Sequence, residues 1–362
     1  MSTELDDLRA AVRAAATELG GPDLCRRLDP NGSGWDEPAW SVLAEQIGVS
    51  AIGLPESVGG IGGLAELVVV AEELGAALLP VPFLSSVLAG QILIRVDDAE
   101  DALTSIAEGE PAAFAGLNRQ GWWTPDETLF TATESGDRWL LEGHAPAVVG
   151  AEAAPWIVVV ADTESGPDVF VVETPQGGVL VSPLETLDLS RAQASVTLSK
   201  ASARRLTTGG TASAAVLPAL DVACIVLAAE QLGGAQASLD NTVAYVKERR
   251  QFGREIGSFQ AVKHTLADLL VLVESSRSAI TRAVDANDLT GATDLTEASA
   301  VARAWCSDAY RTVTAEAVQL HGGIGFTWEH NCHLYFRRAR ADSQLLGGSA
   351  LHRERLAATL AW

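Results

Sequence analysis

The chain has 362 residues, a formal net charge of −22 and 48% hydrophobic side chains. Nucleic-acid binding needs a concentrated basic surface, so this charge argues against that class of protein. An anionic ligand would have to be held by local arginines or by backbone N–H groups. The length allows a large buried core and two or three domains.

Targeting and redox signals predict a cytoplasmic protein. The N-terminus is acidic and helical in pattern, without the basic start and apolar run of a signal peptide. No stretch approaches about 18 uninterrupted apolar residues, which argues against a membrane span. The four cysteines have no paired spacing, as expected for reduced thiols. His330, Cys332 and His333 come nearest to a metal cluster, but neighbours on one helix point in different directions, so no metal site is predicted.

The first part of the chain, residues 1–110, is predicted to form a helical domain. Apolar residues from Val42 to Val49 lead to a Gly/Pro break, and a second helix runs through Leu67 and Leu74. The Gly-Gly-Ile-Gly-Gly run at 59–63 lacks the preceding strand and the later acidic residue of a dinucleotide-binding loop. A tight turn between helices is therefore predicted there.

Residues 111–205 are predicted to form a β domain. Short runs rich in β-branched and aromatic residues are separated by Gly, Pro, Asp and Ser. These runs are 139–141, 156–160, 169–172 and 196–198. No helix-length period intervenes, which indicates an antiparallel sheet or small barrel rather than a βαβ unit.

Residues 206–362 are predicted to form a four-helix bundle. Apolar stripes run from Val262 to Ile280 and from Val301 to Leu320. The segment 285–294 is predicted to be a turn whose Asp294 caps the next helix. Long helices with short connections are typical of bundles. The whole chain is thus predicted to be α+β, in the order helical domain, β domain, bundle.

One segment of the bundle, ERRQFGREIGSFQ at 248–260, has the side chains of a nucleotide site. Arg249 offers a planar, permanently charged fork that suits a pyrophosphate. Phe252 supplies an apolar face, and the amide of Gln260 can hydrogen-bond an adenine or ribose edge. Gln251 lies in the same segment and is included in the predicted site.

A second segment, QLHGG at 319–323, ends a predicted long helix. Gly322 and Gly323 allow backbone N–H groups to approach a ligand closely, and Gln319 precedes them by one turn. The alternative for both segments is structural. Arg249 would then pair with a helical carboxylate, and the glycines would only cap a helix C-terminus.

These two motifs and the order of domains resemble the acyl-CoA dehydrogenase family. The resemblance covers nearly the whole chain, is strongest from 218 to 355, and is weak in the β region. It implies that Arg249 contacts the pyrophosphate of FAD, that Phe252 and Gln260 contact its adenosine, and that Gln319 with the glycine pair completes the site. In the family these segments bind the ADP end of a FAD that belongs to a neighbouring subunit.

The residues of the family's catalytic half are missing at the matching positions. In the family a glutamate removes the α-proton of the acyl-CoA while hydride passes from the β-carbon to the flavin. The matching position here is Leu346, which cannot accept a proton, and the flavin-binding Thr and Gln that follow it are replaced by Gly348 and Ala350. The resemblance therefore implies that this chain contains no catalytic residue of its own.

Some members of the family place the base on an earlier helix, where this chain has Ala223. Asp221 and Glu230 lie near it in sequence. At 100° per residue Asp221 points away from the face of Ala223, and Glu230 lies about two turns further on. Either one remains a candidate for an unrecognised base.

The β region has also lost the family's flavin-ring motifs. The Thr-Glu-x-x-x-Gly-Ser segment corresponds to LNRQGWWTPD at 117–126, and the Trp-Ile-Thr segment corresponds to Ala-Val-Val at 147–149. Trp122 and Trp123 are aromatic candidates for stacking on a ligand. A buried or subunit-contact position is the favoured prediction for both.

The ADP-side residues are thus kept and the ring-side residues are lost, which indicates a division of labour between two chains. The resemblance implies a non-catalytic subunit of an α2β2 acyl-CoA dehydrogenase of the type associated with actinobacterial steroid side-chain degradation. A homologous catalytic subunit would be its partner, FAD the shared cofactor, and electron-transfer flavoprotein the electron acceptor. The alternatives are a self-sufficient homotetrameric flavoenzyme and a flavin-free scaffold.

Overall fold

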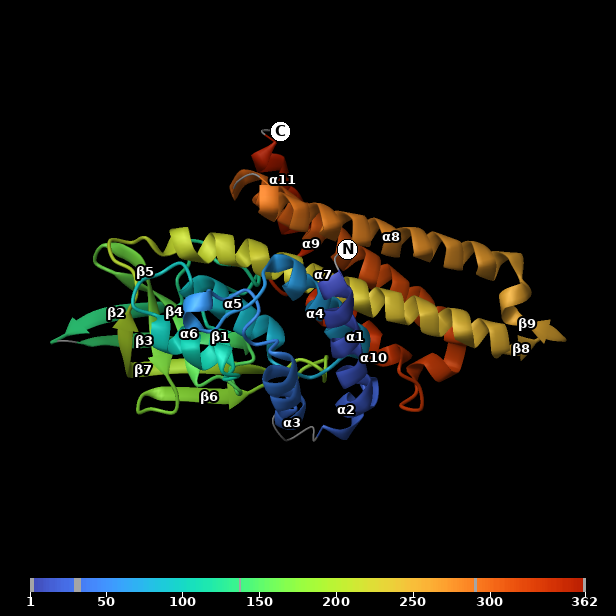
Figure 1. Ribbon diagram of the computed structural model, residues 1–362, viewed down its shortest axis with the longest axis horizontal. Helices are drawn as coiled ribbons and strands as arrows, with labels where there is room; N and C mark the ends of the chain where they lie inside the picture. Colours follow the sequence, from blue (N-terminus) through green and yellow to red (C-terminus); the bar gives the residue numbers. More distant parts are fainter. Residues whose placement is uncertain (1–2, 29–33, 137, 290–291, 361–362) are drawn as a thin grey trace. The chain divides into compact units, whose positions relative to one another are not determined.

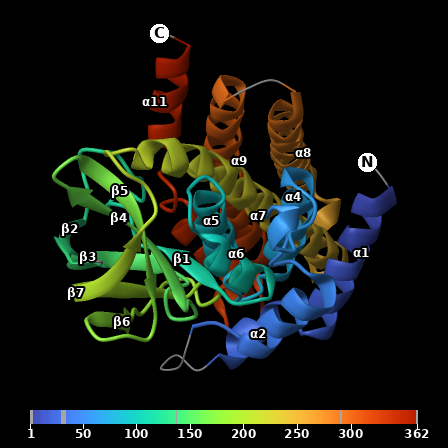
Figure 2. The same ribbon diagram turned by 60° about the vertical axis from the view of Figure 1, so that its left-hand side comes forward.

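The computed structural model describes residues 3–28, 34–136, 138–289 and 292–360, and the chain divides into two compact units. Unit 1 comprises Met1–Arg26, Val68–Leu79 and Cys224–Trp362, and unit 2 comprises Arg27–Leu67 and Pro80–Ala223. The elements of both are labelled in Figures 1 and 2. The predicted division into three domains, 1–110, 111–205 and 206–362, stays a prediction.

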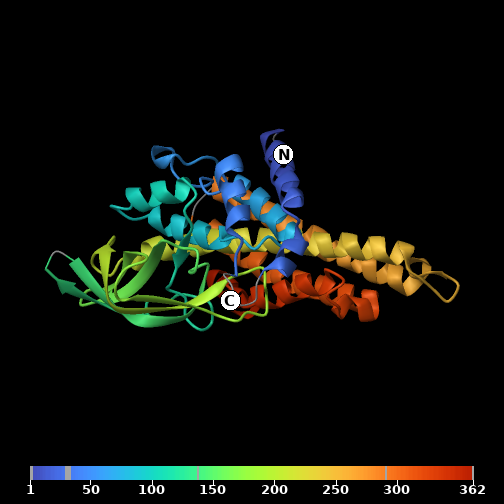
Figure 3. The ribbon, with the colours of Figure 1, turned by 90° about the horizontal axis from the view of Figure 1, so that it is seen from below.

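Unit 1 is built from helices, with one short hairpin. Helix α9 packs against α8, α10 and α11, and Figure 3 shows the long helices running alongside one another. The elements are α1 (Thr3–Glu18), α2 (Pro22–Arg27), most of α4 (Leu64–Ala77), the second part of α7 (Ala212–Glu248), β8 (Arg250–Gln251), β9 (Arg254–Glu255), η3 (Ile256–Ser258), α8 (Gln260–Leu289), α9 (Ala292–His321), η4 (Gly322–Phe326), α10 (Cys332–Asp342) and α11 (Ser349–Thr359).

Helices α4 and α7 approach each other closely at two glycines. A Cβ added to Gly75 would lie 2.0 Å from the carbonyl oxygen of Glu230, and one added to Gly233 would lie 1.8 Å from that of Glu72. Only glycine fits where two backbones come this near. The Glu72 carboxylate beside this crossing accepts from Arg277 at 2.6 Å, which ties α8 to α4.

Helix α7 is long and apolar enough to cross a membrane by composition alone. However, 78% of its most apolar window is buried inside the protein, as in the core helix of a folded domain. The predicted bundle helices are confirmed. The predicted turn at 285–294 is wrong in extent, because α8 continues to Leu289 and α9 begins at Ala292. Asp294 therefore lies within the first turn of α9, where a carboxylate interacts favourably with the helix dipole, and not at the cap.

Unit 2 packs short helices with a seven-stranded sheet. Its helical elements are α3 (Glu37–Ser41), the π-helix η1 (Val42–Ile47), η2 (Glu56–Val58), α5 (Phe83–Leu93), α6 (Glu100–Ala107) and the start of α7. Its strands are β1 (Ala112–Phe114), β2 (Phe130–Ser135), β3 (Arg138–Val149), β4 (Trp156–Thr163), β5 (Gly166–Glu173), β6 (Val179–Pro183) and β7 (Gln193–Arg205).

The sheet closes on itself as a small barrel, as the sequence predicts. Its strand order is β1-β4-β2-β3-β7-β5, and β5 also pairs with β4, while β6 pairs with β7. Most pairs are antiparallel. The short pairings of β4 with β1 and with β2 are parallel, which the sequence pattern did not predict. Inward side chains such as Leu141, Val159 and Phe170 form the core of the barrel.

The Gly-Gly-Ile-Gly-Gly run forms a tight turn before α4, which confirms that prediction. Gly59 and Gly62 have φ values of +86° and +58°, which favour glycine. A Cβ on Gly60 would lie 2.1 Å from the carbonyl oxygen of Leu54, so the chain folds back on itself here. All four cysteines are buried thiols, and none of them forms a disulfide.

Candidate cofactor site

Arg249 follows directly after the end of α7, at the base of the β8–β9 hairpin. Its backbone N–H donates to the carbonyl of Tyr245 at 2.9 Å, and its own carbonyl accepts from Ile256 at 2.8 Å. The backbone is therefore fixed, whereas the side chain is exposed. Within the part of the chain that the structure describes, no carboxylate pairs with this guanidinium. The pairing that would give Arg249 a structural role is absent there.

The tip of the hairpin presents Phe252 to solvent. The two residues of the turn, Phe252 and Gly253, have φ values of +53° and +79°, as in the tight turns that connect hairpin strands. A positive φ is unfavourable for an aromatic residue, and this ring is nevertheless 89% exposed. Its only aromatic neighbour in the described chain is Phe259, edge-on at 6.2 Å. Strain and exposure together indicate a residue placed for contact with a ligand or another chain.

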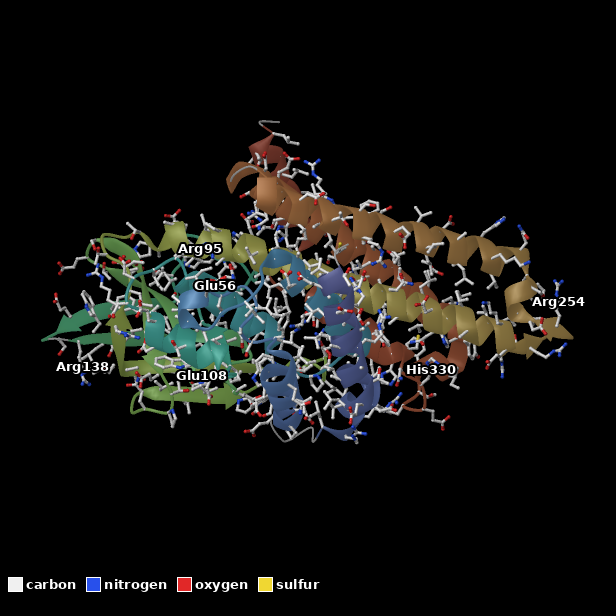
Figure 4. The ribbon with its side chains drawn as sticks, viewed as in Figure 1. Glu56, Arg95, Glu108, Arg138, Arg254 and His330 are labelled. Atoms are coloured by element: carbon white, nitrogen blue, oxygen red, sulfur yellow. The ribbon has the colours of Figure 1, made fainter. Side chains whose placement is uncertain are left out.

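The other residues of this segment are also on the surface. Gln251 is exposed in β8, where it pairs with Arg254 of β9. Gln260 is the exposed first residue of α8, and its amide donates to Nε2 of His264 at 2.7 Å. Arg254 lies over the ring of Phe259 at 3.8 Å from its centroid, and Figure 4 labels it beside the hairpin. The region is locally basic in a chain that is strongly acidic overall.

The second motif lies where α9 ends. Gln319 is exposed in the last turn, and the glycines begin the short helix η4. Gly322 has a φ of +64°, which favours glycine. A Cβ added to Gly322 or to Gly323 would meet no atom within 4 Å, so the space outside both backbones is open. A ligand can therefore approach these amides closely.

Tyr245 and His321 bring the two motifs together. Their rings stack with centroids 4.4 Å apart and an interplanar angle of 23°. The Tyr245 hydroxyl also donates to the carbonyl oxygen of His321 at 3.3 Å. Tyr245 lies one turn before Arg249, and His321 directly precedes Gly322. Neither Tyr245 nor His321 is among the site residues predicted from the sequence. The sequence signal that could have indicated Tyr245 is an aromatic residue four positions before Arg249.

The histidines beside the glycine pair are held neutral. Burial lowers the pKa of His321, although its Nδ1 donates to the carbonyl of Ala317 at 2.7 Å. The pKa of His330 is lowered by burial and by the neighbouring His321, whose ring lies 4.4 Å away. His330, labelled in Figure 4, accepts a hydrogen bond from the backbone N–H of Cys332 at 3.1 Å. These contacts give His330 and Cys332 a packing role.

The position that the resemblance matches to the family's catalytic glutamate is a buried leucine. Leu346 is 3% exposed and has a φ of +48°. Its carbonyl oxygen accepts from Nε2 of His352 at 2.7 Å, and Arg303 donates to the preceding carbonyl of Leu345 at 2.5 Å. The loop is thus fixed by hydrogen bonds to its backbone and carries no proton acceptor here. Gly348 follows as the N-cap of α11, and Ala350 is exposed in its first turn.

Glu230 is engaged in a buried ion pair. Its carboxylate accepts from Arg338 of α10, and both side chains are nearly inaccessible to solvent. The same guanidinium lies 3.5 Å from Asp342. A carboxylate held in this way is occupied by its partner, so Glu230 is poorly placed to act as a base. Asp221 and Ala223, earlier on α7, are both buried.

The loop that replaces the family's ring-side motif folds onto itself. The Asn118 side chain accepts from the backbone N–H groups of Gln120 and Trp122 at 3.0 and 3.1 Å. Trp122 and Trp123 are both buried, as predicted, so neither presents a stacking surface to solvent. In the other motif, Val148 of β3 belongs to the barrel core.

Comparisons with known proteins identify the family. The model of the acyl-CoA dehydrogenase N-terminal domain matches residues 2–100, and that of the C-terminal domain matches residues 213–361. Acyl-CoA dehydrogenase IpdE2 of Mycolicibacterium smegmatis is 37% identical over 350 residues, which cover 96% of each chain.

Two solved structures are also similar. The Tcur3481–Tcur3483 steroid ACAD, a G363A variant, matches with a TM-score of 0.86 and 32% identity over 99% of this chain and 98% of that one. The ChsE4–ChsE5 complex from Mycobacterium tuberculosis matches with a TM-score of 0.88 and 30% identity over 100% of this chain and 98% of that one.

Proposed function

Because this chain belongs to the acyl-CoA dehydrogenase family of FAD-dependent oxidoreductases, we propose that it binds the ADP end of a FAD shared with a homologous catalytic chain. When bound, FAD supplies the hydride acceptor for α,β-desaturation of an acyl-CoA. This chain would orient it, and the partner would supply the catalytic glutamate. The residues proposed to contact FAD are Arg249, Gln251, Phe252, Gln260, Gln319, Gly322 and Gly323.

This proposal rests on the contrast between an exposed region and a buried position of unit 1. The ADP-side residues are exposed and held together by Tyr245 and His321. Arg249 has no carboxylate partner within the described residues, so its charge is available to a pyrophosphate. The position of the base is occupied by the buried Leu346, which has no acid–base chemistry. One half of a shared site fits its cofactor, and the other half lacks its reactive group.

The partner and substrate are proposed from the relatives. Two of the similar structures carry paired names, Tcur3481–Tcur3483 and ChsE4–ChsE5, and the second is described as a complex. This supports an assembly with a homologous subunit, for which we propose α2β2 stoichiometry and a cytoplasmic location. The first of these structures is described as a steroid ACAD, which supports the CoA ester of a steroid side chain as substrate. Electron-transfer flavoprotein is the proposed electron acceptor.

Native mass spectrometry of the assembled protein tests the proposal. The tagged chain is purified from its native cells with the acyl-CoA dehydrogenase homologue that accompanies it, and flavin is quantified per complex. We expect an α2β2 tetramer with one FAD for each pair of unlike chains, because each pair has one complete site. A homotetramer with four flavins would refute the division of labour, and a flavin-free heteromer would refute the role of Arg249.

A self-sufficient enzyme is the second candidate, and the observation that favours it is the buried carboxylate of Asp221 on α7. Glu230 is less suited, because it is paired with Arg338. The visible absorbance of flavin in chain purified without any partner separates the two candidates. Stoichiometric flavin together with turnover of an acyl-CoA, lost in Asp221→Asn, would establish the second.

A further inference from the structure

The two FAD-binding motifs come from different helices, and a single pair of side chains joins them. Arg249 follows α7, whereas Gln319, Gly322 and Gly323 end α9 and begin η4. Tyr245, in the last turns of α7, stacks on His321 at 4.4 Å and donates to its carbonyl oxygen at 3.3 Å. The backbone hydrogen bond from Arg249 to Tyr245 then links this contact to the arginine.

His321 is held by two neighbouring rings and by a hydrogen bond to its own helix. One face of its ring lies against Tyr245, and the ring of His330 lies 4.4 Å away at an angle of 51°. Its Nδ1 donates to the carbonyl of Ala317, one turn earlier on α9. A Cβ added to Gly325 would lie 3.0 Å from the Cβ of His321, so η4 packs tightly on this residue. The residue directly before the glycine pair is therefore held in place by its neighbours.

The hydroxyl of Tyr245 also has an electrostatic role. The carbonyl groups at the C-terminus of a helix lack intrahelical partners and carry partial negative charge, which disfavours an anion nearby. His321 is the last residue of α9, and the Tyr245 hydroxyl satisfies its carbonyl. The hydroxyl therefore reduces the negative partial charge that a pyrophosphate beside Gly322 would face.

We infer that Tyr245 is a positioning residue of the FAD site, which sets the Arg249 guanidinium against the amides of Gly322 and Gly323. This inference rests on the proposed function. The arginine and the glycine amides can bind one pyrophosphate only if their separation is fixed before the ligand arrives, because mobile groups lose binding free energy on ordering. The ring fixes the separation, and the hydroxyl reduces an opposing partial charge.

Two substitutions separate the ring from the hydroxyl in the complex with the catalytic partner. Tyr245→Phe keeps the stacking and should weaken FAD binding about 3- to 10-fold, the loss of one hydrogen bond. Tyr245→Leu removes both contacts and should weaken it about 30-fold or more. Saturating FAD should restore the wild-type kcat in both variants, because only the binding of FAD is impaired.

The matched control is Tyr335→Phe. The Tyr335 hydroxyl also donates to a backbone carbonyl, that of Ala76 at 2.6 Å, within the same unit but outside the FAD motifs. The Tyr335→Phe substitution should therefore leave FAD affinity unchanged. Equal FAD affinity of wild type, Tyr245→Phe and Tyr245→Leu would overturn the inference if Arg249→Ala releases the flavin. If Arg249→Ala also keeps its flavin, the proposed ADP site itself is wrong.

Discussion

His352 donates from Nε2 to the carbonyl oxygen of Leu346 at 2.7 Å, and its Nδ1 accepts from Arg355 at 3.2 Å. A carbonyl can only accept and a guanidinium can only donate, so this imidazole is the neutral Nε2–H tautomer. Burial and the nearby Arg303 lower its pKa to about 3. The loop that occupies the position of the family's base is therefore held by a histidine that must stay uncharged.

The free energy of unfolding of this chain should decrease as the pH is lowered, because of His352. Its pKa is about 3 when folded and about 6.5 when unfolded, so the unfolded state binds the proton first. The stabilisation is complete above about pH 6.5 and is lost as pH falls towards 3, by at most about 1.4 kcal/mol per pH unit. Denaturant unfolding at pH 7 and 5 measures the loss. His352→Gln keeps a hydrogen-bond donor but has no group that titrates in this range. This variant should therefore lose less stability between pH 7 and pH 5.

Other buried histidines contribute in the same direction. The pKa values of His321, His330 and His333 are also lowered by burial. The comparison must therefore be the difference between wild type and His352→Gln, not the total acid sensitivity. An identical pH dependence in both proteins would show that His352 is not the buried neutral group described here.

Leu346→Glu should not make this chain an enzyme. The carboxylate would enter a buried site, which raises its pKa and costs about 1–3 kcal/mol of stability. We expect the flavin ring still to lack a pocket, because Trp122, Trp123 and Val148, at the positions of the family's ring-side motifs, are buried. Acyl-CoA turnover by the chain without partner is the measurement. Gln344→Glu, at an exposed position of the same loop, is the control for added charge. Activity in Leu346→Glu alone would mean that a ring pocket exists.

Arg249→Ala should release FAD from the assembled complex. Removing a charge-assisted contact with the pyrophosphate should cost about 1.5–3 kcal/mol of binding free energy. The side chain is exposed and has no carboxylate partner in the described chain, so the unfolding midpoint should not change. Arg250→Ala is the matched control, because this neighbouring exposed arginine faces Glu255 at 4.0 Å. Equal flavin content in both variants would assign Arg249 a different role.

Phe252→Asn should separate stability from binding. Asparagine adopts the left-handed conformation more readily than phenylalanine, so about 1 kcal/mol of backbone strain should be relieved. The isolated chain should therefore be slightly more stable, while the complex binds FAD more weakly because the aromatic face is lost. Thermal unfolding and flavin titration measure the two effects. Phe326→Asn is the control, since Phe326 is exposed without a positive φ. A loss of stability in Phe252→Asn would contradict the strain argument.

Much of the architecture could be predicted from local patterns. Helical periodicity, β-rich runs and the Gln-x-x-Gly-Gly motif depend on residues close together in sequence. The boundary at Asp294 was misplaced because helix ends are set by packing and not by one polar residue. The parallel pairing of β1 with β4 depends on the path of the whole chain, which no local pattern encodes.

Long-range contacts at the site could not be predicted in the same way. Glu230 and Arg338 are 108 positions apart, and only the fold shows that the glutamate is engaged. Tyr245 and His321 are 76 positions apart. The sequence showed which residue types could bind a nucleotide. It did not show which side chains hold them in place.

The aromatic rings left uncovered in the hairpin and after the glycine pair have a consequence for the lifetime of the protein in a cell. Phe252, Phe326 and Trp328 are 89%, 72% and 55% exposed in the single chain. Large exposed apolar side chains promote self-association and chaperone binding until a partner covers them. An orphan copy should therefore be cleared or aggregate, so that the abundance of this subunit follows the synthesis of its counterpart.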